Sequence, residues 1–173
     1  MNNIILTGLM GAGKSTVGKT LARRHGMEFI DSDRVIEERT GVDIPTIFAI
    51  EGEQGFRDRE QQVIAELAVK KGVVIATGGG SLLREENRQV LTDSGLLVYL
   101  RASANQLYSR IRYDKNRPLM QTDNPLQTLT DLLKQREPVY LDTADLVIRT
   151  GKQRLGVTIK QIEKGLRALG ELD

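Results

Sequence analysis

The sequence predicts an α/β protein in which a doubly wound parallel sheet carries helices on both faces. Two observations predict it: short apolar runs rich in β-branched residues, and longer stretches of helical periodicity between them. Several runs are apolar at nearly every position, as expected of parallel strands buried on both faces. The predicted strands span residues 4–7, 28–30, 73–76, 96–100 and 145–148.

The helical stretches each place apolar residues on one face, and they span residues 15–24, 54–71, 125–137 and 153–169. Residues 113–124 lack this periodicity and contain Pro118, so a long exposed loop is expected there. The chain shows no internal repeat, low-complexity segment or linker. We therefore expect a single domain over residues 1–173.

Composition excludes several classes of protein. The 173 residues include no cysteine, which excludes disulfides, thiolate catalysis and cysteine-ligated zinc. Twenty-five Lys and Arg against 23 Asp and Glu are too balanced for a bulk nucleic-acid binder. The longest apolar run, 96–100, is far below the roughly 20 residues of a membrane helix. The amino terminus has no basic region typical of a signal peptide, so a soluble cytoplasmic protein is expected.

A phosphate-binding loop is predicted directly after the first strand. Residues 8–15 read G-L-M-G-A-G-K-S and match G-x-x-x-x-G-K-[ST] between a strand and a helix, as the motif requires. Its glycines let consecutive N–H groups point inward, and the helix amino terminus adds positive potential. Lys14 would reach the β- and γ-phosphates, and the Ser15 hydroxyl would hold Mg²⁺. The alternative is a glycine-rich turn that binds nothing.

The loop predicts a nucleoside triphosphate but does not identify what receives the phosphate. A switch GTPase typically carries N-K-x-D and D-x-x-G segments, and neither occurs here. A small-molecule kinase and a non-catalytic nucleotide-binding module remain. Only the kinase needs the acceptor residues described next.

Two carboxylates follow the second strand, at the sheet edge that faces the ligand crevice in open α/β folds. Asp31 is a candidate for outer-sphere contact with Mg²⁺. Asp33 is a candidate to accept a hydrogen bond from an acceptor hydroxyl and to take its proton. The alternative is an Asp pair that caps the following helix.

Two arginines are predicted to point inward. On the helix 54–71, Arg57 shares a face with Ile64 and Ala68, and Arg136 shares a face with the leucines that precede it. Buried charges cost several kcal/mol unless they are paired, and a guanidinium matches a carboxylate or a phosphate. Glu60 is placed to orient Arg57 from the same face. The alternative is an internal Arg–Glu ion pair.

Residues 77–81 read T-G-G-G-S after the third strand. Glycines there let a ligand approach the backbone, whose N–H groups can donate to it. The alternative is a flexible turn at the strand exit.

Residues 101–120 hold five basic side chains against the single acid Asp114. A basic loop near a phosphate-binding loop suggests a lid that closes on phosphates, with Arg117 and Pro118 at its tip. The alternatives are a solvated charge run and a nucleic-acid patch. The shortage of aromatic neighbours argues against the nucleic-acid patch.

Taken together, these motifs resemble the shikimate kinase family nearly end to end. The resemblance rests on the phosphate-binding loop at 8–16 and on six further segments. They are F-I-D-S-D at 29–33, E-G-E-x-x-F-R at 51–57, A-T-G-G-G at 76–80, R-P-L at 117–119, R-x-P-x-Y at 136–140 and A-D-L-V-I-R-T at 144–150. It implies a fold of the nucleoside-monophosphate-kinase type, with a five-stranded parallel sheet, a lid over 112–124 and a substrate-binding helical region over 33–60. It also implies phosphoryl transfer from ATP to shikimate, giving shikimate 3-phosphate for chorismate and aromatic amino-acid synthesis.

The resemblance also implies roles for individual residues. Arg57 and Arg136 would hold the acceptor carboxylate, and Asp33 with the Gly79–Gly80 backbone its hydroxyls. Lys14 and Arg117 would stabilise the phosphates, and Ser15 would bind Mg²⁺. The implied nucleotide-binding residues are Gly11, Ala12, Gly13, Lys14, Ser15, Thr16, Arg110, Arg117 and Gln153. A monomer with ATP and shikimate as substrates, and no nucleic-acid or membrane partner, is expected. The alternatives are a related kinase for gluconate or a nucleoside monophosphate, and the non-catalytic nucleotide-binding module.

Overall fold

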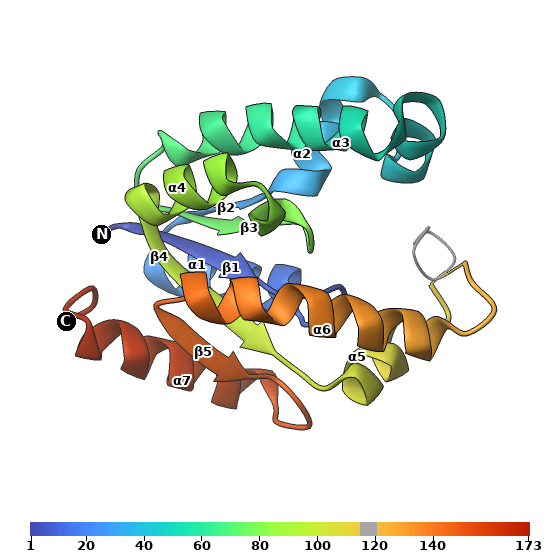
Figure 1. Ribbon diagram of the computed structural model, residues 1–173. Helices are drawn as coiled ribbons and strands as arrows, with labels where there is room; N and C mark the ends of the chain where they lie inside the picture. The colour runs from blue at the N-terminus through green and yellow to red at the C-terminus, as the bar shows by residue number, and fades with distance from the viewer. Residues whose placement is uncertain (115–120) are drawn as a thin grey trace.

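A computed structural model describes residues 1–114 and 121–173. Its strands form one parallel sheet in the order β2-β3-β1-β4-β5, with helices on both faces (Figure 1). The fold class and the five predicted strands are therefore confirmed, with ends shifted by at most one residue. The strands are β1 (Asn3–Thr7), β2 (Glu28–Asp31), β3 (Val73–Ala76), β4 (Gly95–Arg101) and β5 (Leu146–Arg149).

The strand register brings the predicted functional segments to one edge. Thr7, directly before the phosphate-binding loop, pairs with Tyr99 of β4. Asp31 pairs with Ala76, directly before the glycine segment. Because all pairs are parallel, these carboxyl-terminal ends lie together, which is where open α/β sheets bind ligands.

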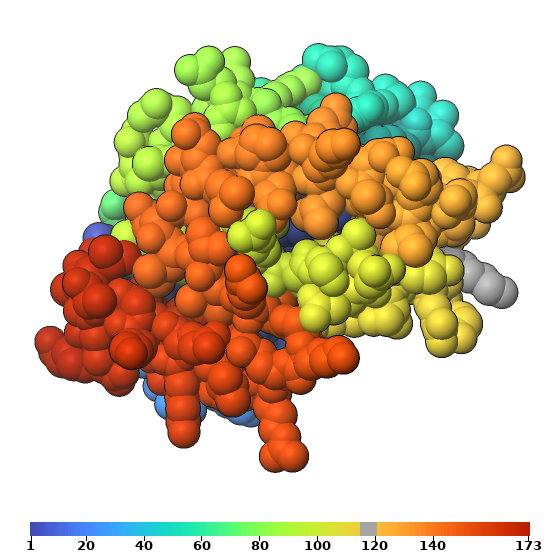
Figure 2. Space-filling model, turned by 60° about the horizontal axis from the view of Figure 1, so that its bottom comes forward, coloured from blue at the N-terminus to red at the C-terminus, as the bar shows by residue number. Residues whose placement is uncertain are grey.

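The helices divide between the two faces of the sheet. On one face α1 packs against β3 and α7, and α7 covers β5; on the other α3 packs against α4, and α4 and α6 contact β4. Figure 2 shows α6 as a ridge between α3–α4 and α5–α7. The helices are α1 (Lys14–His25), α2 (Ser32–Thr40), α3 (Ile44–Ala68), the 3₁₀ turn η1 (Ser81–Leu83), α4 (Glu85–Ser94), α5 (Ala104–Ile111), α6 (Pro125–Thr143) and α7 (Leu155–Ala168).

The predicted helices all exist, but their extents differ. The one predicted over 54–71 is the second part of α3, which begins at Ile44 and is interrupted at Gly52, whose φ of 71° is not helical. The helix predicted to end at 137 continues through Pro138 to Thr143. Helices α4 and α5 were not predicted, whereas α2 lies within the helical region that the resemblance implies over 33–60. The Ser103 capping box, in which Gln106 bonds back to the cap, was the sequence signal for α5.

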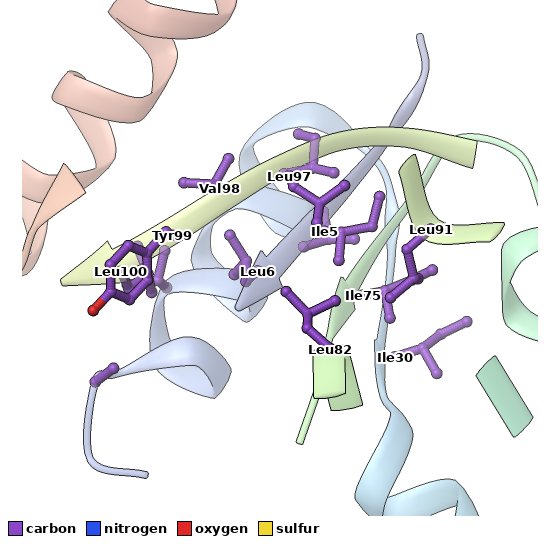
Figure 3. Packing of buried hydrophobic residues seen from close by; sticks show 14 of the residues in the cluster. Ile5, Leu6, Ile30, Ile75, Leu82, Leu91, Leu97, Val98, Tyr99 and Leu100 are labelled. Carbon is purple, nitrogen blue, oxygen red and sulfur yellow. The ribbon is translucent and has the colours of Figure 1, made fainter. Parts of the chain in front are cut away.

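The hydrophobic core follows the sheet and both of its faces. Ile5, Leu6 and Ile75 of the central strands are fully buried, with Leu91 of α4 against them (Figure 3). In the part of the chain that the structure describes, no helix is long and apolar enough to cross a membrane. The core thus holds β1 and β3 rigidly while their carboxyl ends carry the polar loops.

Candidate active site

A cleft of about 710 Å³ opens at the carboxyl ends of the strands. This volume is in the range that holds small ligands. One wall is the phosphate-binding loop, and the other combines α2, α3, the glycine segment and α6. Its lining residues are Met10, Gly11, Ala12, Gly13, Lys14, Ser15, Thr16, Asp31, Asp33, Glu37, Asp43, Ile44, Pro45, Phe48, Phe56, Arg57, Glu60, Thr77, Gly78, Gly79, Gly80, Asp114 and Arg136.

The phosphate-binding loop has the curled backbone that its sequence predicts. Gly8, Gly11 and Gly13 have φ values of 147°, 83° and 96°, a region that side chains disfavour. Gly13 is the N-cap of α1, so the helix amino terminus points into the cleft. The Lys14 ammonium donates to the carbonyls of Gly8 (2.5 Å) and Leu9 (3.2 Å). The loop is thus preformed around its own lysine.

Two side chains from later in the sequence fix this loop from behind. Arg110 donates to the carbonyl of Gly11 (2.8 Å) and to those of Thr150 and Gly151. The Thr150 hydroxyl donates to the carbonyl of Ala12 (3.1 Å). Arg110 therefore contacts the loop backbone, outside the residues that line the cleft.

Gln153 lies in the turn between β5 and α7, and the structure does not bring it to the described cleft lining. Its amide donates to Thr158 Oγ1 (2.8 Å) and Gln161 Oε1 (3.0 Å). Arg117 lies outside the described residues. Arg101, part of the predicted basic lid, ends β4 and pairs with Glu137 (2.7 Å), so the basic segment begins in fixed structure.

Ser15 and Asp31 form the candidate metal site. The Ser15 hydroxyl donates to Asp31 Oδ2 (3.1 Å). Asp31 is also the N-cap of α2, where its Oδ1 accepts from the amides of Asp33 (3.0 Å) and Arg34 (3.3 Å). The predicted alternative of a capping Asp is thus true of Asp31, while Asp33 turns into the cleft.

Asp33 is a buried carboxyl whose pKa is raised to about 7. Burial is the largest cause, because it disfavours the charged form, and the carboxylates of Glu60 and Asp31 add to it. Lys14 and Arg57 oppose the rise. Within the described chain Oδ1 has no hydrogen-bond partner. A buried acceptor atom that faces a cleft without a partner is available to a ligand hydroxyl.

Arg57 is 9% exposed and lies in the cleft wall, as the helical spacing predicts. Its Nη1 donates to Glu60 Oε1 (2.9 Å), and Glu60 Oε2 accepts from Ser81 Oγ (2.9 Å). The predicted Arg–Glu pair is therefore present together with the inward placement. Arg57 Nε has no partner among the described residues, so this pair does not satisfy the whole guanidinium.

Arg136, 5% exposed, faces the same cleft from α6. Burial lowers its pKa, and the nearby positive charge of Arg57 lowers it further. Its Nε also lacks a partner in the described structure. Two buried guanidinium groups that repel each other are stabilised by an anion between them. The anion site that the sequence suggested would therefore lie in this cleft, beside Arg57 and Arg136.

The three glycines of the 78–80 segment make room for these side chains. A Cβ at Gly78 would stand 2.7 Å from Asp33 Oδ1, and one at Gly79 would stand 3.2 Å from Arg136 Nη1. A Cβ at Gly80 would stand 2.7 Å from Arg57 Nη1. The sequence suggested that a ligand approaches this backbone. The structure adds that charged side chains of the protein itself also lie against this backbone, a different side chain at each of the three glycines.

Sequence reasoning missed an apolar wall in the cleft. Phe48 and Phe56 pack with ring centroids 4.9 Å apart, and Arg57 lies 5.2 Å from the Phe56 ring centre. The two rings meet because Gly52 breaks α3 between them. The one signal in the sequence was that glycine within a helical pattern.

Comparison with known proteins identifies relatives along nearly the whole chain. The family model described as shikimate kinase matches residues 10–167. A shikimate kinase from Nitrosococcus oceani is 53% identical over 165 residues, covering 95% of this chain and 87% of that protein.

Solved structures agree with the sequence match. A structure of shikimate kinase from Acinetobacter baumannii in complex with shikimate superposes with a TM-score of 0.95 at 45% identity, covering 100% of this chain and 96% of that one. Shikimate kinase from Bacteroides thetaiotaomicron gives a TM-score of 0.88 at 32% identity, covering 96% of this chain and 98% of that one.

Proposed function

The chain belongs to the shikimate kinase family and phosphorylates a hydroxyl group of shikimate, and from that premise we propose how its cleft holds both substrates and Mg²⁺. ATP occupies the phosphate-binding loop, and shikimate lies opposite it against α2, α3 and α6. The product is shikimate 3-phosphate, for chorismate and aromatic amino-acid synthesis.

One observation supports placing ATP at the phosphate-binding loop and shikimate on the opposite side of the cleft. Arg57 and Arg136 are buried, line one cleft with the phosphate-binding loop, and each keeps a buried Nε without a partner in the described chain. Asp33 lines the same cleft, interacts electrostatically with Lys14 and Arg57, and has its own oxygen without a partner in the described chain. A small acid that carries hydroxyls would satisfy all three groups at once.

On the nucleotide side, backbone N–H groups of residues 11–16 cradle the phosphates, and Lys14 exchanges its carbonyl partners for phosphate oxygens. We propose that Arg110 and Gln153 support nucleotide binding indirectly. Arg110 fixes the backbone at Gly11, and Gln153 shapes the turn before α7. Arg117, near the tip of the lid, is proposed to reach the transferred phosphoryl group on closure.

Ser15 and Asp31 suit Mg²⁺. The ion prefers hard oxygen ligands and keeps several waters, so a hydroxyl and a carboxylate beside bound phosphates are enough. The described chain has no cluster of three or more His, Cys, Asp or Glu for an all-protein metal cage, which agrees with that mode of binding. When bound, Mg²⁺ neutralises phosphate charge. Ser15 would contact it directly, and Asp31 through water.

The chemistry requires positioning more than covalent help, because phosphoryl transfer is largely dissociative. Ionised Asp33 accepts the hydrogen bond of the acceptor hydroxyl. The hydroxyl oxygen forms a bond to the γ-phosphorus as the bond from that phosphorus to the leaving ADP oxygen breaks. The hydroxyl proton passes to Asp33. Lys14 stabilises the phosphate charge.

A coupled assay of ADP release tests the proposal, with shikimate, gluconate and AMP as separate acceptors. We expect turnover with shikimate alone, and ³¹P NMR should show a new phosphate ester on the 3-hydroxyl. Turnover with AMP or gluconate instead would place the chain with other kinases. ATP binding without acceptor-dependent turnover would indicate a non-catalytic module.

We further propose that one kinase domain over residues 1–173, with a lid over 112–124 and a substrate-binding region over 33–60, acts as a cytoplasmic monomer without nucleic-acid or membrane partners. The cleft brings the phosphate-binding loop together with Arg57 and Arg136, so the two proposed subsites need no residue from a second copy of the chain. Sedimentation velocity at assay concentration tests it, and a dimer would contradict it.

A further inference from the structure

Tyr140 is a buried polar residue of α6 that the mechanism above does not use. It is 1% exposed and lies behind the cleft wall, while the two groups that it contacts, Arg136 and Gly79, both line the cleft. Its hydroxyl donates to the carbonyl oxygen of Gly79 and lies near the Arg136 guanidinium, whose positive charge opposes the rise in the pKa of Tyr140. Burial raises the pKa of Tyr140 to about 12, so the hydroxyl keeps its proton at physiological pH and can donate.

The contact with Gly79 also fixes the next residue. The described residues include no cis peptide bond, so the carbonyl of Gly79 and the N–H of Gly80 point in opposite directions from one rigid plane. A hydroxyl that holds this carbonyl therefore turns the Gly80 N–H away from Tyr140. Gly80 itself borders the cleft.

We propose that Tyr140 is a positioning residue that sets the spacing between the two ends of the acceptor subsite. It holds Arg136, which contacts the carboxylate, and the Gly79–Gly80 peptide, which contacts a hydroxyl. An acceptor whose carboxylate and hydroxyl match this spacing binds without reorganisation of the site. The inference rests on the proposed roles of Arg136 and the Gly80 backbone.

The chain provides a matched control, because Tyr99 packs directly against Tyr140. Their ring centroids are 4.9 Å apart at 37°, and both rings are fully buried. The Tyr99 hydroxyl donates to Glu137 Oε1 (2.9 Å), which in turn pairs with Arg101. The two tyrosines therefore share packing but differ in what their hydroxyls hold.

The test compares Tyr140→Phe with Tyr99→Phe in steady-state kinetics. For Tyr140→Phe we expect the KM for shikimate to rise about tenfold, with the KM for ATP within about twofold of the parent, because only the acceptor subsite loses the hydroxyl that holds the Gly79 carbonyl and lies near the Arg136 guanidinium. For Tyr99→Phe both KM values should stay within about twofold. An unchanged shikimate KM in Tyr140→Phe, equal rises in both KM values, or the same rise in Tyr99→Phe would overturn the proposal.

The Arg136→Ala background adds a second readout. If Tyr140 acts partly through Arg136, the tenfold effect should shrink to about threefold or less there, because contacting residues are not additive. Full additivity would contradict coupling through Arg136. A parent protein that does not turn over shikimate would show that the proposed function is wrong. An unchanged shikimate KM in Arg136→Ala would show that the proposed acceptor site is wrong. If Arg136→Ala raises the shikimate KM and Tyr140→Phe does not, the inference about Tyr140 is wrong while the proposed function is unaffected.

A measurement on the unsubstituted protein covers the case in which Tyr140→Phe does not fold. The four tyrosines are labelled at ¹³Cζ and assigned with Tyr→Phe variants at the other three positions. Shikimate should shift the Tyr140 signal and leave the Tyr99 signal in place. A Tyr140 signal that does not respond to saturating shikimate would contradict the proposal.

Discussion

Gly80 lies against the guanidinium of Arg57 so closely that a side chain at position 80 has no room. An added Cβ would stand 2.7 Å from Nη1 and closer still to Nη2. The backbone itself is ordinary there, with φ −100°, so space and not strain requires the glycine.

Gly80→Ala should displace Arg57 and raise the KM for shikimate about tenfold or more, since the displaced guanidinium no longer meets the carboxylate. Steady-state kinetics in both substrates measure it. Gly156→Ala is the control, because its Cβ meets nothing within 4 Å and its φ is not in the positive range. A normal shikimate KM in Gly80→Ala would mean that Arg57 can move at no cost to acceptor binding.

Arg136→Ala should weaken shikimate binding by more than about 1.5 kcal/mol, because a charge-assisted pair is lost. Isothermal titration calorimetry with shikimate measures this directly. Arg23→Ala, on the exposed side of α1, is the control and should bind as the parent does. Equal affinity in Arg136→Ala and the parent would remove Arg136 from the acceptor site.

Asp33→Asn should lower kcat by about 10²-fold or more, since an amide cannot take the hydroxyl proton. In the parent, kcat/KM for shikimate should fall as pH drops through about 7, the pKa of Asp33 in the ligand-free protein, because the protonated carboxyl cannot take the hydroxyl proton. A flat profile between pH 6 and 8 would contradict the role.

The same raised pKa affects stability with a definite sign. The folded protein holds the Asp33 proton up to about pH 7, whereas the unfolded chain releases it near 3.8. Stability is therefore lost progressively as pH rises between these values, and the loss is complete above about 7. Asp33→Asn should accordingly raise the melting temperature of the ligand-free protein more at pH 8 than at pH 4. Equal shifts at both pH values would show that burial does not perturb this carboxyl.

Lys14→Met should fold normally but lose at least about 10²-fold in turnover, because the loop loses the charge that meets the phosphates. Circular dichroism measures whether the variant folds, and the ADP-release assay measures its turnover. Lys19→Met, on the same helix away from the cleft lining, is the control. Retained full activity would contradict the phosphate-binding assignment.

Removal of divalent ions with EDTA should abolish turnover, and Mg²⁺ should restore it. Asp31→Asn keeps an oxygen that can cap α2, so its melting temperature should stay near the parent value, whereas its requirement for Mg²⁺ should rise. Asp31→Ala should lose about 1 kcal/mol of stability in addition, because the cap is removed. An unchanged Mg²⁺ dependence in Asp31→Asn would separate Asp31 from the metal.

The sequence by itself determined the sheet, the phosphate-binding loop and the inward placement of Arg57 and Arg136. These are local properties: continuous apolar runs mark the buried strands, a period of 3.6 residues marks the buried face of each helix, and the loop motif is contiguous. A charge on an apolar helical face, as at Arg57, could therefore be recognised without coordinates.

Only the tertiary structure decided which residues meet across the cleft. Tyr140 and Gly79 are 61 positions apart, and Phe48 reaches Phe56 because Gly52 bends the helix between them. The prediction that Gln153 binds the nucleotide depended on resemblance alone, and no local pattern indicated that its amide bonds to Thr158 and Gln161 of α7. Such contacts depend on crossover connections and helix packing, whose geometry no local pattern encodes.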